Sequence, residues 1–301
     1  MKTALLGEDD PGTLRTATNL ATVYRIEKRI IESIDLFEET LATQERLLGD
    51  DHPDTLATVN DLAGTYRSVK RYKDAMRLFR LAVKGMTETL GPEHPDTLIA
   101  MNNLALVHLN LDESAAAIPL LEHILNIRRD KLGNDHENTL ITLSALGSAH
   151  HRNGDDAKAI EFYSEVRRER QKKQGPEFWN TLHATSNLAE IHRCSGNYIQ
   201  AIELNEFVLE IRLRKIGPEH AHTLLTKNNL AAAYRDAGQT EKAVPLLQDV
   251  WEARVKALGA DAPETVRTRR RLDALRGKSA ARQQTNDADS CPQMNQPSNK
   301  E

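Results

Sequence analysis

The sequence predicts an all-α fold built from a repeated helical hairpin. Two series of residues recur every 42 positions without insertion, and apolar residues follow each repeat start at helical spacing. Hydrophobic residues make up 39% of the chain, aromatic residues 4% and charged residues 28%, which suits helices that each bury one narrow apolar face. The recurring residues are glycine at Gly7, Gly49, Gly91, Gly133, Gly175, Gly217 and Gly259, and threonine at Thr13, Thr55, Thr97, Thr139, Thr181, Thr223 and Thr265.

The first helix of each repeat, here called helix A, is described by offsets counted from its threonine, which is offset zero. Leucine or valine fills offset 1, leucine fills offset 7, a small residue fills offset 8 in most copies, and a ring fills offset 11. These offsets differ by three and four, so they share one stripe of a helix. The ring residues are Tyr24, Tyr66, His108, His150, His192 and Tyr234.

The second helix, helix B, follows a short break and carries a small residue at offset 20 and large apolar residues at offsets 21 and 23. Small residues at offsets 8 and 20 let two helices approach closely, so each repeat is expected to form an antiparallel hairpin. Segments such as His52-Pro53-Asp54-Thr55 read as helix starts, with proline in the first turn and histidine as the cap.

The repeats predict the organisation of the whole chain. Residues 1–9 are expected to end a preceding repeat, and residues 10–259 to form six hairpins. Residues 260–276 should form a capping helix with a polar outer face, and residues 277–301 a disordered tail. No stretch approaches eighteen apolar residues and no secretory signal is evident, so a cytoplasmic location is expected.

The pattern of leucine at offset 7, a small residue at 8, a ring at 11, alanine at 20 and an aromatic residue at 24 resembles the tetratricopeptide repeat. The 42-residue period and the phrases around Gly91-Pro92-Glu93-His94 and Asn102-Asn103-Leu104-Ala105 look like the kinesin-light-chain type of that family. The resemblance implies a right-handed α-solenoid of six hairpins plus a C-terminal capping helix. It also implies a non-catalytic scaffold that binds proteins or peptides in a groove lined by helix A.

Residues for catalysis, metal binding or a cofactor are not evident, and none of these is expected. The chain has no phosphate-binding glycine loop, dinucleotide fingerprint or kinase catalytic loop. His136-Glu137 begins a zinc-protease-like string, but Leu140 stands where the second histidine is needed. His220 and His222 fit helix capping better than metal binding, and His150 fits a place in the core.

Two positions beside the core stripe of helix A form the candidate binding site. Offsets 5 and 12 lie at 140° and 120° around the helix, so they should face the concave side. Asparagines at and next to offset 5 match the ladder that binds an extended peptide in the kinesin-light-chain family, and the arginine column at offset 12 favours an acidic peptide. The predicted peptide-binding residues are Asn60, Asn102, Asn103, Asn187, Asn228, Asn229, Arg25, Arg67, His151, Arg193 and Arg235.

Several alternatives remain open. The asparagines could instead join neighbouring hairpins by hydrogen bonds. The chain could be the regulatory part of a multidomain serine/threonine kinase or NTPase. The chain could also be an RNA-binding solenoid that uses the arginine column, although a net charge of −4 disfavours nucleic acid as a partner. The basic run from Arg167 to Lys173 could contact RNA or an acidic membrane, but it is more typical of a charged outer helix face. No membrane partner is expected, and weak self-association is predicted through Leu5, Leu6 and the first hairpin.

Overall fold

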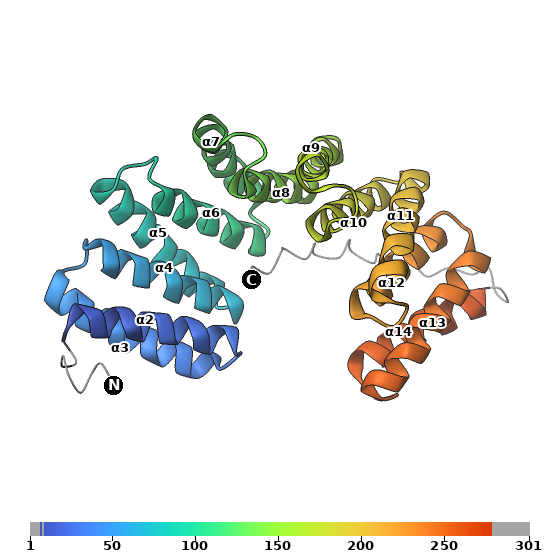
Figure 1. Cartoon of the computed structure of the whole chain (residues 1–301), viewed down its shortest axis with the longest axis horizontal. Coiled ribbons are helices and arrows are strands. Elements are labelled where there is room, and N and C mark those ends of the chain that lie inside the picture. The colour runs from blue at the N-terminus through green and yellow to red at the C-terminus, as the bar shows by residue number, and fades with distance from the viewer. Residues whose placement is uncertain (1–6, 8, 279–301) are drawn as a thin grey trace. The chain divides into compact units, whose positions relative to one another are not determined.

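The computed structural model describes residues 7 and 9–278, and this part of the chain is helical throughout, with short connecting loops (Figure 1). Leu5, Leu6 and most of the predicted tail lie outside the described residues. The described helices are α2 (Pro11–Ile26), α3 (Ile30–Leu48), α4 (Pro53–Ser68), α5 (Tyr72–Thr89), α6 (Pro95–Asn110), α7 (Ser114–Leu132), α8 (Glu137–Arg152), α9 (Asp156–Gln174), α10 (Trp179–Cys194), α11 (Tyr198–Ile216), α12 (Ala221–Asp236), α13 (Thr240–Leu258) and α14 (Pro263–Lys278).

The helix starts confirm the predicted caps. His52 and His94 precede α4 and α6, and the Nδ1 atom of each accepts a hydrogen bond from the backbone N–H two residues later, at 3.2 Å and 3.3 Å respectively. Such a bond satisfies one of the first N–H groups of a helix, which have no partner within the helix. Phe178 holds the corresponding place before α10, and its side chain has no atom that could accept such a hydrogen bond.

The threonine at offset zero closes the loop between repeats. Thr97 and Thr139 are fully buried, and their hydroxyl groups donate to the carbonyl oxygens of Gly91 and Gly133 at 2.9 Å and 2.8 Å. Gly91 has a φ angle of +96°, a conformation that is strained for other residues. Glycine and threonine recur together because they build the same loop.

The chain divides into two compact units, Met1–Asn153 and Gly154–Glu301, here called unit 1 and unit 2. Consecutive helices pack against each other from α2 to α8 in unit 1 and from α9 to α14 in unit 2. The division lies between α8 and α9, inside the fourth predicted hairpin. The next junction, between the fourth and fifth repeats, is regular, because α9 and α10 pack like other neighbours.

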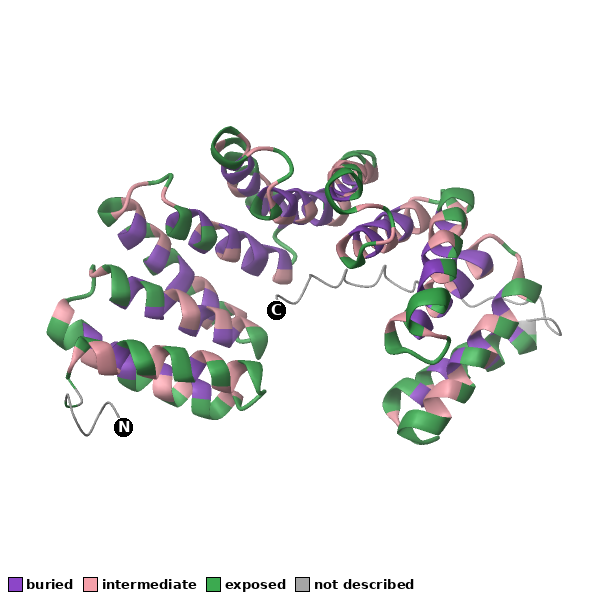
Figure 2. Ribbon diagram, in the orientation of Figure 1, coloured by how far each residue is buried: buried purple, intermediate pink, exposed green. Residues whose placement is uncertain are grey.

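The core of each unit follows the predicted stripe. Leu62, Leu104, Leu146, Leu188 and Leu230, all at offset 7, are buried. The small residues at offsets 8 and 20 are buried too, and most have no exposed surface. Buried residues recur along the helices of both units (Figure 2). The fold prediction of a tetratricopeptide-type α-solenoid is therefore confirmed.

The first helix exposes residues that other repeats bury. Leu20 in α2 is 43% exposed, whereas Leu62 at the same offset is 3% exposed, and Val23 beside Leu20 is 44% exposed. Because adjacent exposed apolar side chains on a helix favour association, we expect concentration-dependent self-association of the chain, weakened by Leu20→Lys with Val23→Lys. Static light scattering over a concentration series measures this effect. A wild-type chain that stays monomeric throughout, or equal weakening by the isolated surface change Leu81→Lys, would contradict it.

Candidate functional site

The A helices lie next to one another within each unit. Helix α2 contacts α4, α4 contacts α6 and α6 contacts α8, while in unit 2 α10 contacts α12. The A helices of a unit therefore form one layer, with consecutive members in direct contact. The offsets beside the core stripe of this layer form what we call the inner face.

The asparagines of the inner face are partly engaged with one another. The Asn103 amide donates to the Oδ1 atom of Asn60 at 3.3 Å, joining α6 to α4. Arg271 of α14 donates to Oδ1 of Asn228 in α12, also at 3.3 Å. Each bond runs from offset 6 of one repeat to offset 5 of the repeat before. At both places a side-chain amide therefore joins neighbouring repeats, which is the alternative that the sequence left open for the asparagines.

The predicted asparagines differ in how far their side chains are exposed to solvent. Asn60, Asn103, Asn187, Asn228 and Asn229 are half-buried. Asn102 is only 7% exposed, and its Oδ1 atom is buried without a hydrogen-bond partner. Half-buried amides can reach a ligand, whereas the carbonyl oxygen of Asn102 is closed to one in this structure.

The arginines of unit 1 lie close enough to one another for their charges to interact. Burial raises the pKa of Asp61, and the charge of Arg25 partly offsets that effect. Burial, followed by repulsion from Arg25, lowers the pKa of Arg67. The two guanidinium groups therefore repel each other, while the Asp61 carboxylate attracts that of Arg25.

The arginines of unit 2 are neutralised by the chain itself, which the sequence did not predict. Arg193 forms ion pairs with Glu190, at 2.8 Å, and with Asp236, while Arg235 pairs with Asp236 at 2.8 Å. Although burial opposes the charged form, the hydrogen bonds and charges of Glu190 and Asp236 raise the pKa of Arg193. The charges of these two arginines and two carboxylates cancel, so Arg193 and Arg235 need no anionic partner. His151, also predicted, is half-buried at the end of α8.

A second series of arginines, which the sequence analysis did not predict, joins neighbouring repeats. Arg128, Arg212 and Arg254 each donate to a threonine hydroxyl at offset 3 of the next repeat, at 2.7, 2.6 and 2.6 Å. Arg170 lies at the same offset and donates to the carbonyl oxygen of Asn180 at 3.3 Å. Burial lowers the pKa of Arg128 and of Arg212 to about 10. The 42-residue spacing of these arginines is the signal that could have revealed them.

A cluster of rings lies beside this series in unit 2. The rings of Trp179 and His222 meet edge to face with centroids 4.2 Å apart, and the Arg212 guanidinium lies 5.3 Å from the Trp179 centroid. His220 caps α12 through its Nδ1 atom, as predicted. Burial, followed by the charges of Arg170 and Arg212, lowers the pKa of His183 to about 4.

The described residues contain no group of three or more histidine, cysteine, aspartate or glutamate side chains able to hold a metal ion. His150, a tempting candidate in the sequence, is 4% exposed and occupies the core, as predicted. Within the described part of the chain, the helices are too short or too polar to cross a membrane.

The sequence matches the tetratricopeptide repeat family model over residues 12–88, 78–130, 96–171 and 180–254. The chain belongs to the tetratricopeptide repeat family. No curated protein matches the sequence.

Solved structures agree with this assignment. A putative kinesin light chain with nearly identical tetratricopeptide-like repeats from Podosopora anserina is 28% identical, with a TM-score of 0.63, over 69% of this chain and 98% of its own. BtubC from P. vanneervenii is 18% identical, with a TM-score of 0.63, over 76% of this chain and 92% of its own. A signal-transduction ATPase with a tetratricopeptide repeat sensor from Pyrococcus horikoshii is 16% identical, with a TM-score of 0.66, over 89% of this chain and 39% of its own. The predicted resemblance to the kinesin-light-chain type is confirmed.

Proposed function

We propose that this tetratricopeptide repeat protein is a non-catalytic scaffold whose inner face binds an extended, acidic segment of a partner protein. The observation that carries the proposal is the repulsion between the half-buried guanidinium groups of Arg25 and Arg67 on the inner face of unit 1. Burial makes two nearby guanidinium groups costly unless an anion compensates them. A carboxylate of the partner would reduce this repulsion.

The asparagines supply the means to hold a peptide backbone. An amide side chain offers two donors and two acceptor positions, so the bond of Asn60 with Asn103, and its second bond with Asp61, leave each amide with further capacity. In unit 2, Arg193 and Arg235 are already compensated by Glu190 and Asp236. The acidic residues of the ligand should therefore lie against unit 1, with Asn60 and Asn103 contacting its backbone.

The test uses a fluorescent peptide probe of alternating glutamate and alanine, about ten residues long and so up to ~35 Å when extended. Arg67→Ala is expected to weaken binding about tenfold, chiefly by slowing association, and to reduce the dependence on salt. The matched control is Arg77→Ala, which removes an exposed arginine on helix B of the same repeat. Equal weakening by the two substitutions, or no saturable binding by the wild type, would refute the proposal.

A regulatory role within a multidomain kinase or NTPase, and the cellular location of the chain, require separate tests. A kinase or NTPase reading frame continuous with this sequence in the genome would favour a regulatory role, in which the same inner face receives the signal. We propose a cytoplasmic location for the scaffold, which cell fractionation would test.

A further inference from the structure

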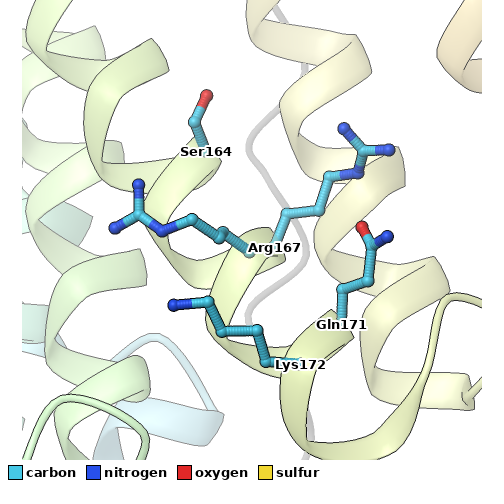
Figure 3. Close-up of a pocket in the computed structure, with 5 residues that line it drawn as sticks. Ser164, Arg167, Gln171 and Lys172 are labelled. Atoms are coloured by element: carbon cyan, nitrogen blue, oxygen red, sulfur yellow. The ribbon is translucent and has the colours of Figure 1, made fainter.

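A pocket of about 440 Å³ opens on helix α9, and none of its described lining residues belongs to an A helix. The side chains that line it rise from this one helix (Figure 3). The described lining residues carry three cationic groups, one hydroxyl and one amide, and none of them is a carboxylate. They are Ser164, Arg167, Arg168, Gln171 and Lys172.

Arg167 is not the residue that the repeat requires at its position. The equivalent residues Leu41, Val83, Leu125 and Leu209 are apolar, and Leu41 and Leu125 are buried. The Nε atom of Arg167 is buried and has no hydrogen-bond partner. A charged guanidinium whose Nε is buried without an acceptor is costly, and an anion in the pocket, beside the rest of the Arg167 side chain that lines it, would offset that cost.

The other two cations are held in place beside it. Arg168 and Lys172 both pair with Glu169, each at 3.1 Å, and Glu169 is not among the residues that line the pocket. Three cations against this one carboxylate leave a surplus of two positive charges. The pocket therefore suits a compact anion that carries more than one negative charge.

We propose that this pocket binds the phosphate group of a phosphorylated side chain on a partner protein. Arginine pairs with phosphate oxygens through two parallel hydrogen bonds, and lysine, hydroxyl and amide groups can donate to the remaining oxygens. Ligands with a nucleobase usually stack on an aromatic ring, and the described lining residues offer none. The site lies on helix B, so it does not depend on the proposed peptide-binding face.

Fluorescence anisotropy with a phosphoserine peptide flanked by neutral residues tests this proposal, with the same peptide unphosphorylated as reference. The wild-type chain is expected to bind the phosphorylated form at least about tenfold more tightly, and inorganic phosphate should compete. Arg167→Leu restores the residue found in three other repeats, so it should fold and lose this preference. Lys172→Gln should weaken the preference, whereas the exposed control Arg77→Gln should leave it unchanged.

Two further measurements distinguish a phosphate site on α9 from binding at the inner face and from a loss of folding. Arg167→Leu should bind the acidic probe of the inner face as the wild type does, and circular dichroism should show an unchanged helix content. Equal affinity for the two serine peptides, or retention of the preference in folded Arg167→Leu, would overturn the proposal. Binding of a single-stranded RNA that depends on Arg167, without phosphopeptide binding, would overturn it in favour of RNA.

Discussion

Replacing Phe79 by alanine is expected to lower the free energy of unfolding by about 3–5 kcal/mol, the usual cost of removing a buried phenylalanine ring. Phe79 lies on α5 at offset 24, has no exposed surface, and belongs to a core that includes Leu56, Val59 and Leu62. The cavity would open between neighbouring helices, and a solenoid holds together only through contacts between neighbours. Urea unfolding followed by circular dichroism measures the loss.

The matched control lies two residues further along the same helix. Leu81 is 47% exposed, so Leu81→Ala should change the free energy of unfolding by no more than about 0.5 kcal/mol. A loss below about 1 kcal/mol for Phe79→Ala, or similar losses for both variants, would show that the described core does not stabilise this part of the chain.

Acidification should destabilise unit 2 through His183. Because burial and the adjacent charges of Arg170 and Arg212 lower the pKa of His183 from 6.5 to about 4, the folded state binds a proton less readily than the unfolded chain. The stability contributed by neutral His183 is therefore complete above pH 6.5 and decreases as the pH falls towards 4. The full effect is about 3 kcal/mol.

The substitution His183→Leu isolates this contribution, because Leu225 occupies the same offset in the next repeat. Unfolding free energies of the variant and the wild type, compared between pH 7 and pH 4.5, should diverge as the pH falls, with the variant losing less. His123→Leu, on the exposed surface of α7, provides the control. Parallel curves for His183→Leu and the wild type would exclude His183 as the cause.

The sequence was sufficient to predict the helices, their caps and the core stripe, because these features depend on residues close together in the chain. His52 illustrates the cap: its ring bonds a backbone N–H two residues away, and the local pattern alone implies that contact. The burial of Leu62 follows equally from the 3.6-residue period of a helix.

The sequence did not reveal which charges compensate one another between repeats. Arg193 pairs with Asp236, 43 residues later, and Asn103 bonds to Asn60, 43 residues earlier. These contacts depend on how one helix A is displaced along the next, which the period within a helix does not determine. For the same reason, the sequence did not show that carboxylates lie beside the arginines at offset 12. It also did not show that the chain divides between α8 and α9.

The position of a bound peptide tests the central claim most directly. The acidic probe, carrying a photoreactive benzophenone at its centre, would be crosslinked to the wild-type chain and the modified residues mapped by mass spectrometry. We expect crosslinks on the A helices of unit 1, centred on α4 and α6, and their loss when unlabelled probe is in excess. Crosslinks confined to B helices such as α5 or α9, or labelling that unlabelled probe does not suppress, would contradict a peptide site on the inner face.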